Sequence, residues 1–223
     1  VSHDLKSPLS HLNLLSEGLL EEFGQLDEEE KIRKIQLIHQ VSSQGKALLD
    51  NLQFWVLSQK DIIRPAFRPT RLNDEIAAVL QLLDPHIRQK ALTVSVPDQP
   101  VEVYTDKNML STILRNLISN AIKYMDKQNG MKGIIQIRVK DVGDFVQVEI
   151  EDNGKGIAAK DLPYIFDRFY RTDSSRNSST GGSGIGLSIV KKIIEDHGGK
   201  IWATSREGVG TVMYFVIRKY QEV

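Results

Sequence analysis

The hydrophobic pattern of this sequence changes once, within residues 61–71, and the change predicts two parts with different folds. Before it, apolar residues recur at spacings of three and four, which is typical of amphipathic helices. Pro65 and Pro69 then interrupt the helical period. After it, strand-like alternation is interleaved with helical patterns. We therefore expect a helical domain at 1–60, a linker at 61–71, and an α+β domain at 72–223.

The first part predicts two long helices joined by a short turn at residues 24–28. Asp27 and Glu30 have the spacing of a capping box at the start of the second helix. The two apolar stripes are formed by Leu5, Leu9, Leu12, Leu19 and Phe23, and by Ile38, Val41, Leu48, Leu52 and Trp55. A two-helix hairpin cannot cover both stripes by itself. We therefore predict an all-α helical hairpin that forms a homodimer through a four-helix bundle.

The second part predicts an α+β domain with one sheet and helices on one face. Asn73 and Asp106 can each cap a helix, the first through Leu83 and the second through about Tyr124. A third helix is expected from Ile185 to about Asp196. Strands are expected at residues 92–96, 101–104, 134–140, 145–151, 200–204 and 210–217.

Composition limits the function classes. The chain has 29 basic and 29 acidic residues and a net charge of zero, so we expect no nucleic-acid partner. It has no cysteine, which excludes disulfides and thiolate chemistry and fits a reducing compartment. No apolar run reaches bilayer-spanning length, so we expect a soluble, cytoplasmic piece without direct membrane contact. The helical pattern is already running at Val1, which predicts a fragment of a longer protein.

An imidazole and a carboxylate stand together at the start of the first helix. His3 lies two residues before Leu5, about 200° round the helix from the apolar stripe, and should face solvent or a partner. Pro8 has no N–H to donate to the carbonyl of Asp4, which leaves the backbone there open. His3 and Asp4 therefore form a candidate nucleophile and base, although a solvated surface pair is the commoner explanation of such residues.

A carboxylate is predicted on the apolar face of a strand. Val146, Val148 and Ile150 point to one face, and Asp152 continues that register. Burying a carboxylate requires hydrogen-bond donors, and the glycine-rich turn that follows lets a ligand approach the backbone closely. The alternative is an ordinary Asx turn at the end of a strand.

Two further patterns suit phosphate groups. The glycines of residues 181–187 lead into an amphipathic helix, whose free N–H groups and dipole favour an anion. Asn116, Asn120 and Lys123 share one helix face and suit a hydrated Mg²⁺ and phosphate oxygens. A flexible loop and an exposed polar helix face are the respective alternatives.

In this order and spacing the motifs resemble those of the sensor histidine kinases of two-component signalling, over essentially the whole chain. The resemblance rests on a phosphoacceptor box at 2–9, an N box at 116–123, a first glycine box (Asp152, Gly154, Gly156), an F box (Ile165 to Phe169), and a second glycine box (Gly182, Gly184, Gly186). It implies a dimeric hairpin followed by an α+β sandwich of the Bergerat type, which binds ATP.

The resemblance implies an ATP-dependent protein-histidine kinase that phosphorylates His3 and passes the phosphoryl group to an aspartate in the receiver domain of a response regulator. Asp4 would be the general base, Asn120 would bind Mg²⁺, and Asp152 would accept from the adenine amino group. Asn116 and Lys123 would assist at the phosphates, and residues 171–183 would form a lid over ATP. The other implied nucleotide contacts are Tyr124, Gly154, Gly156, Ile157, Phe169, Gly182, Ser183, Gly184, Ile185, Gly186 and Leu187.

Two residues depart from related patterns. Related chaperone and topoisomerase ATPases carry a water-activating Glu where this chain has Asn116, which argues against a plain hydrolase. Many histidine kinases carry Thr or Asn at the position of Ser7, where it positions water for dephosphorylation, so a phosphatase role of Ser7 stays open. The rival interpretations are a nucleotide-binding scaffold without phosphotransfer and a chaperone-type ATPase.

Overall fold

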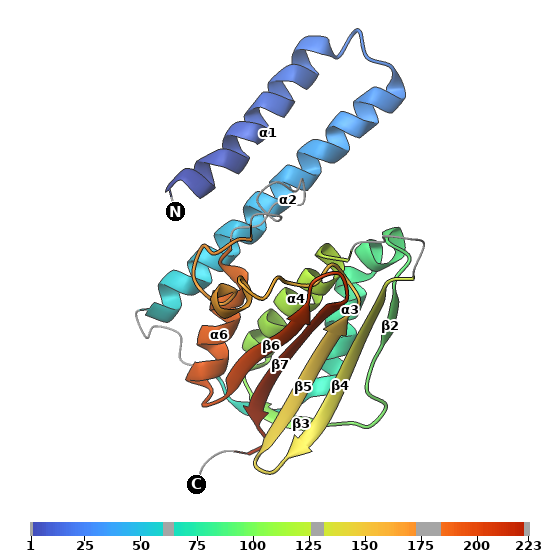
Figure 1. The fold of residues 1–223 in the computed structure, drawn as a ribbon. Helices are drawn as coiled ribbons and strands as arrows, with labels where there is room; N and C mark the ends of the chain where they lie inside the picture. Colours follow the sequence, from blue (N-terminus) through green and yellow to red (C-terminus); the bar gives the residue numbers. More distant parts are fainter. Residues whose placement is uncertain (1, 60–64, 126–131, 173–183, 221–223) are drawn as a thin grey trace. The chain divides into compact units, whose positions relative to one another are not determined.

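The computed structural model describes residues 2–59, 65–125, 132–172 and 184–220. The chain forms two compact units (Figure 1). The hairpin unit comprises residues 1–63 and 173–185, and the sandwich unit comprises residues 64–172 and 186–223. Of the helices in these described stretches, none is both long and apolar enough to cross a membrane.

The hairpin unit contains helices α1 (Ser2–Glu22) and α2 (Glu28–Gln59). The predicted capping box is confirmed, because Asp27 Oδ1 accepts from the Glu30 N–H at 2.8 Å and Glu30 Oε2 accepts from the Asp27 N–H at 3.3 Å. Among the side chains described in α1 and α2, Val41 is the only buried hydrophobic one. The exposed apolar residues are Leu9, Leu14, Leu20, Phe23, Ile32, Ile35, Leu37 and Leu49.

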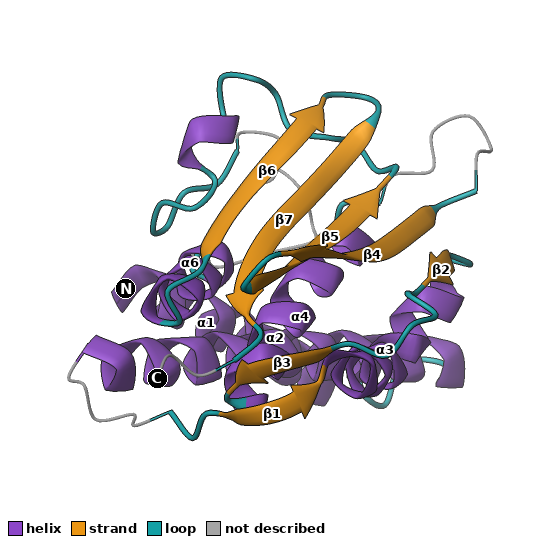
Figure 2. Cartoon of the chain, turned by 90° about the horizontal axis from the view of Figure 1, so that it is seen from below, coloured by secondary structure: helices purple, strands orange, loops and turns teal. Residues whose placement is uncertain are grey.

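The sandwich unit is built on a five-stranded sheet. The strand order is β2 (Thr93–Ser95), β4 (Ile134–Val142), β5 (Phe145–Asp152), β7 (Gly210–Arg218) and β6 (Lys200–Arg206). The β2–β4 pair is parallel and the other pairs are antiparallel. Helices α3 (Leu72–Gln89), α4 (Lys107–Lys123) and α6 (Gly186–Asp196) lie on one face of this sheet (Figures 1 and 2). The short 3-10 helix η2 spans Leu162–Tyr164.

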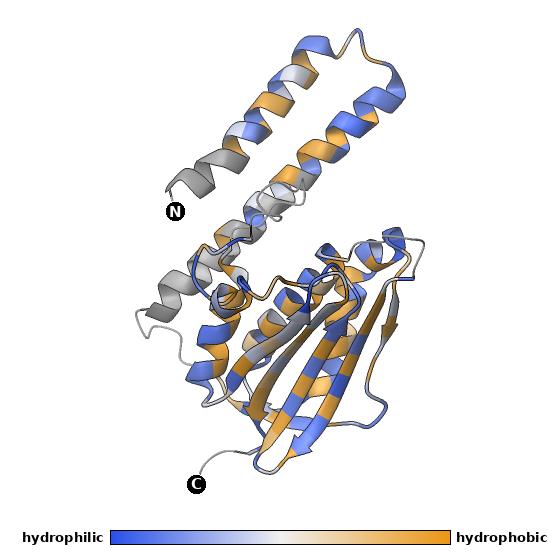
Figure 3. Cartoon of the chain, in the orientation of Figure 1, coloured by the Kyte–Doolittle hydropathy of each residue, from blue (hydrophilic) through white to orange (hydrophobic). Residues whose placement is uncertain are grey.

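The core lies between the sheet and these helices. Apolar and polar residues alternate along β4 and β5 (Figure 3), as expected for strands with one buried face. Val146, Val148 and Ile150 of β5 are buried, as are Leu114 and Leu117 of α4. Each such side chain stabilises the fold by about 1.5–3 kcal/mol relative to its exposed state. This packing fixes the end of β5 relative to α4.

Two details of the predicted sandwich were wrong. Strand β1 (Arg68–Arg71), which lies inside the stretch expected as a linker, pairs with β3 (Glu102–Thr105) in a separate two-stranded sheet. The domain therefore does not have a single sheet. Its regular structure begins at Arg68, because β3 offers this segment an unpaired edge.

Asn73 does not cap α3. The cap position is Arg71, and Asn73 lies within the first turn. Its amide instead holds the loop before β3, donating to the Pro97 and Gln99 carbonyls at 3.0 and 3.1 Å and accepting from the Val101 N–H at 2.9 Å. That loop has few backbone partners of its own, so it satisfies its polar groups through Asn73. By contrast, the cap predicted at Asp106 is confirmed.

Candidate functional site

The polar face of α4 forms one wall of the candidate site. Asn116, Asn120 and Lys123 are half-exposed, whereas Leu117 and Ile118 are buried on the opposite side, as predicted. The Asn116 amide donates from Nδ2 to the Thr112 carbonyl at 2.9 Å. This hydrogen bond holds the amide in one orientation, with its oxygen Oδ1 next to Gly186 of α6.

The carboxylate of Asp152 lies at the end of β5, on the face that the helices cover. Asp152 is only 9% exposed, which confirms the burial predicted from the alternation along this strand. Burial raises the pKa of this carboxyl to about 6, while backbone N–H donation from Gly154 and Thr211 acts in the opposite direction. The Gly154 N–H donates to Oδ1 at 2.9 Å. The site therefore offers a buried, oriented hydrogen-bond acceptor.

The turn after Asp152 is enclosed by backbone on both sides. A Cβ on Gly154 would lie 2.6 Å from the Tyr124 carbonyl oxygen, and one on Gly156 would lie 2.1 Å from the Arg206 carbonyl oxygen. Gly156 also has a φ of +70°. Both positions therefore require glycine, and this need explains the first glycine box physically.

The same turn is tied to its neighbours by hydrogen bonds. The Lys155 N–H donates to the Tyr124 carbonyl at 3.2 Å, and the Gly208 N–H donates to the Lys155 carbonyl at 2.7 Å. The Ile157 N–H donates to Ser205 Oγ at 2.8 Å. The end of α4, the turn and the loop between β6 and β7 thus form one connected frame.

Positive charge gathers at the C-terminal end of α4. Burial lowers the pKa of the Lys123 ammonium to about 8, with further contributions from the positive charges of Arg171 and Lys155. The Nζ atoms of Lys123 and Lys155 lie 4.9 and 4.8 Å from the centroid of the Tyr124 ring. Such a cluster of cations favours an anionic ligand.

Lys90, which directly follows α3, donates hydrogen bonds to this end of α4. It was not singled out in the sequence. Its Nζ donates to the carbonyls of Ile122 at 2.7 Å, Lys123 at 3.1 Å and Met125 at 3.3 Å. These carbonyls lie at the C-terminal end of α4 and in the turn that follows it, where a cation is favourable. A lysine at the end of an amphipathic helix carries no sequence signal for such a role, because its partners follow about thirty residues later.

The glycine-rich entry to α6 is described in part. Gly184 has a φ of +68°, Ile185 is buried, and Leu187 is half-buried in the first turn of α6. Phe169 has a φ of +61° and its side chain is 43% exposed. Gly182 and Ser183 lie outside the described residues, as does most of the predicted lid.

His3, Asp4 and Ser7 lie in α1, but their side chains are outside the described part of the structure. Within the described residues no group of three or more His, Cys, Asp or Glu side chains could hold a metal ion. The chemistry of the α4 face nevertheless fits Mg²⁺. Amide oxygens are hard ligands, and Mg²⁺ usually takes one or two protein ligands together with phosphates and water.

Comparison with known proteins places this site in a family. Residues 105–221 match the profile of the family described as histidine kinase-, DNA gyrase B-, and HSP90-like ATPases. Sensor histidine kinase WalK of Bacillus subtilis is 31% identical over 237 residues, which cover all of this chain and 36% of that protein. Cyanobacterial phytochrome B of Nostoc is 33% identical, over 97% of this chain and 28% of that protein. The chain thus spans about a third of these relatives.

Solved structures agree. The Acinetobacter baumannii histidine kinase AdeS has the same fold, with a TM-score of 0.75 over 98% of both chains at 22% identity. The catalytic domain of histidine kinase ThkA is 33% identical with a TM-score of 0.56, over 69% of this chain and 95% of that one. A further structure, of ThkA with response regulator protein TrrA, has a TM-score of 0.69 at 26% identity, over 99% of this chain and 60% of that one.

The buried acceptor, the amide-bearing helix and the cation cluster occupy an α+β sandwich that matches the family of histidine kinase-, DNA gyrase B- and HSP90-like ATPases. The chain belongs to the sensor histidine kinases, and its sandwich unit is their ATP-binding domain.

Proposed function

We propose that this chain is the catalytic core of a sensor histidine kinase, which transfers the γ-phosphoryl group of ATP to His3 and then to an aspartate of a response regulator. The observation that carries the proposal is the buried carboxylate of Asp152 beside the cationic end of α4. This arrangement provides an acceptor suited to the adenine amino group and positive charge suited to phosphates. The sequence similarity to WalK over the whole chain supports the same activity.

The division of the chain follows from this activity. We infer a dimerisation and phosphotransfer domain at residues 1–60 and a catalytic domain at 72–223. Of the linker expected at 61–71, the last four residues form strand β1 (Arg68–Arg71) and belong to the catalytic domain. Leu14 and Leu20 of α1 are 69% and 77% exposed, and Ile32 and Ile35 of α2 are also exposed. So much apolar surface on one hairpin favours a homodimeric four-helix bundle.

The phosphotransfer step balances with the residues assigned by resemblance. A ring nitrogen of His3 attacks the γ-phosphorus, the bond from that phosphorus to the bridging oxygen breaks, and ADP leaves. Asp4 accepts the imidazole proton. Transfer of the phosphoryl group to a receiver aspartate then restores His3.

Asn120 is the residue of this chain that would hold Mg²⁺. Asn116, on the same face of α4, would assist at the phosphates. When bound, the ion would neutralise the negative charge of the phosphates. The structure of ThkA with TrrA supports a receiver domain as the partner of this chain.

The test is phosphorylation of the whole chain by ATP and Mg²⁺, followed by mass spectrometry. The unmodified chain should gain one phosphate, and His3→Gln should abolish the gain. His11→Gln, which changes an exposed histidine of the same helix, should leave it intact. Labelling of His3→Gln would refute the assignment. Steady release of phosphate without a labelled chain would favour a chaperone-type ATPase, and nucleotide binding without either would favour a scaffold.

A further inference from the structure

In the turn formed by Gly154, Lys155 and Gly156, Lys155 carries the one side chain. Close backbone approaches exclude any Cβ at the two glycines, so Lys155 is the one position in this turn where a side chain fits. Its backbone is held at both ends, by Tyr124 at 3.2 Å and by Gly208 at 2.7 Å. The base of the Lys155 side chain is therefore fixed relative to α4.

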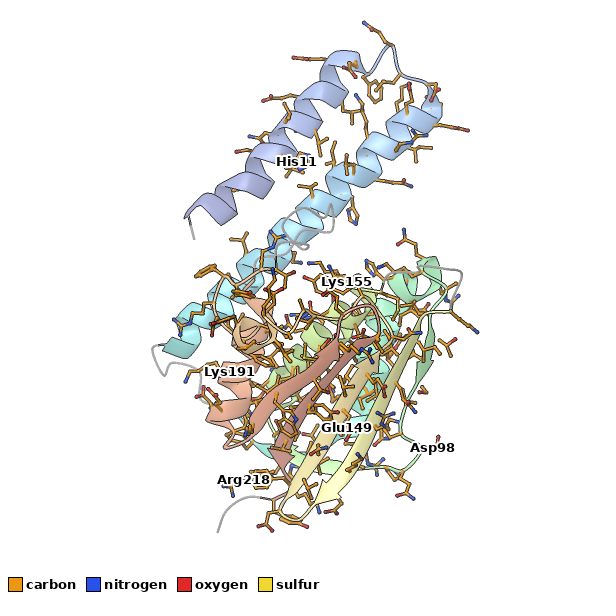
Figure 4. All side chains as sticks on the ribbon, in the orientation of Figure 1. His11, Asp98, Glu149, Lys155, Lys191 and Arg218 are labelled. Carbon is orange, nitrogen blue, oxygen red and sulfur yellow. The ribbon has the colours of Figure 1, made fainter. Side chains whose placement is uncertain are left out.

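The Lys155 ammonium is directed to the cation cluster of α4. Figure 4 shows Lys155 beyond the end of β5, away from Glu149 in the middle of that strand. Its Nζ lies 4.8 Å from the centroid of the Tyr124 ring, and Lys123 Nζ lies 4.9 Å from the same centroid. The two ammonium groups thus share one aromatic ring through cation–π contacts.

Holding like charges together in a partly buried site is unfavourable, and the lowered pKa of Lys123 reflects this repulsion in addition to burial. A polyanion bound between the two ammonium groups would remove the repulsion and gain two charge-assisted hydrogen bonds. Tyr124 serves as the spacer, because its ring attracts both cations.

We propose that Lys155 is a phosphate-contacting residue, whose ammonium forms with Lys123 a two-lysine clamp on the polyphosphate of the nucleotide. This inference rests on the proposed function, since it assumes that the site binds ATP. Both lysines of the clamp belong to the connected frame formed by the end of α4, the turn after Asp152 and the loop between β6 and β7. The clamp is therefore separate from the lid that the resemblance implies. It adds a contact from the position between the two glycines.

The test compares binding of ATP, ADP, adenosine and inorganic tripolyphosphate to the whole chain by calorimetry. Lys155→Met should weaken ATP and tripolyphosphate about tenfold and adenosine by less than about twofold. Lys155→Arg should retain most of the affinity, because the positive charge is kept. Lys191→Met, at an exposed lysine of α6, is the matched control and should bind like the unmodified chain. Melting temperatures of the variants would show that all are folded.

Two results would overturn the clamp: unchanged ATP affinity in Lys155→Met, or an equal loss for adenosine and ATP, which would mean that Lys155 acts only by placing Tyr124. Failure of the proposed function looks different. An unmodified chain that binds tripolyphosphate in a Lys155-dependent way but no nucleotide would support the clamp and refute the ATP site, whereas no binding of either would refute both.

Discussion

A Cβ atom on Gly186, the first residue of α6, would lie 2.6 Å from the side-chain oxygen Oδ1 of Asn116 on α4. Gly186 of the second glycine box and Asn116 of the N box are therefore in direct steric contact within the sandwich unit. The glycine leaves room for the amide, and the amide in turn is held by its bond to the Thr112 carbonyl. A requirement for glycine at this position therefore follows from packing against the site.

Gly186→Ala should displace the Asn116 amide and weaken ATP binding about tenfold, measured by calorimetry. Alanine favours helix over glycine by about 1 kcal/mol, so the fold itself should not be weakened. In an Asn116→Ala background the same change should have little further effect, because the obstructing oxygen is gone. Additive losses in this double-mutant cycle would contradict the steric explanation.

Nucleotide affinity should fall as the pH rises above about 8. The pKa of Lys123 is lowered to about 8, so the free enzyme loses this positive charge well below the usual range of lysine. Binding of a polyphosphate requires the charged form and would take up a proton at higher pH. Calorimetry of ADP in two buffers of different ionisation enthalpy measures that proton. In Lys123→Met the proton uptake should disappear, and its persistence would assign the titration to another group.

The stability of the chain without nucleotide should rise with pH in the same range, whereas nucleotide affinity falls. Because the folded pKa of Lys123 lies below its unfolded value, the unfolded chain binds more protons between these two values. The free energy of unfolding therefore rises as the pH increases from about 8 towards 10.5.

Local patterns in the sequence were sufficient for the parts of the site that one element determines. The alternation along β5 predicted the burial of Asp152, and the spacing of three and four predicted the shared face of Asn116, Asn120 and Lys123. The cap at Asp106 was predictable for the same reason, since its partners Asn108 and Met109 follow at once.

Contacts between distant segments could not be predicted in this way. Lys90 reaches carbonyls at the end of α4, and Asn73 bonds the loop before β3 instead of the helix that it was expected to cap. The pairing of β1 with β3 likewise depends on the closed fold. In each case the residues form their hydrogen bonds with a segment that is distant in the sequence, which local patterns do not reveal.

Lys90→Met should lower the free energy of unfolding by about 1–3 kcal/mol, measured by urea denaturation, because the ammonium that donates to three carbonyls at and just after the negative end of α4 is lost. ADP affinity should fall as well, since those carbonyls flank Lys123 and Tyr124. The matched control is Arg88→Met in the same helix. The Arg88 side chain is 80% exposed and forms a surface ion pair with Asp84, so its loss should change stability by less than about 1 kcal/mol. Equal effects of the two changes would contradict the capping role of Lys90.

His197, at the end of α6, should make the sandwich unit sensitive to acid. The residue is 7% exposed, its Nδ1 lies 2.5 Å from the Ile193 carbonyl, and its ring packs edge-on against Phe67 at 4.7 Å. Within the described part of the chain Nε2 has no hydrogen-bond partner. Burial lowers the pKa of this imidazole, while the Ile193 bond and the charges of Asp106 and Asp196 act in the opposite direction.

The sign of the pH effect follows from that lowered pKa. As the pH falls below 6.5, the unfolded chain binds a proton at His197 that the folded chain excludes, so the free energy of unfolding declines with a slope of up to about 1.4 kcal/mol per pH unit. His197→Gln keeps a donor for the Ile193 carbonyl and does not titrate, and should reduce this slope in urea denaturation between about pH 5 and pH 7. His86→Gln changes an exposed histidine of α3. This control should leave the slope of the unfolding free energy with pH as in the unmodified chain. Asp152 titrates in the same range with the opposite sign, but its contribution is common to all three proteins and cancels in the comparison. Parallel pH profiles for the unmodified chain and His197→Gln would show that the buried imidazole does not control acid stability.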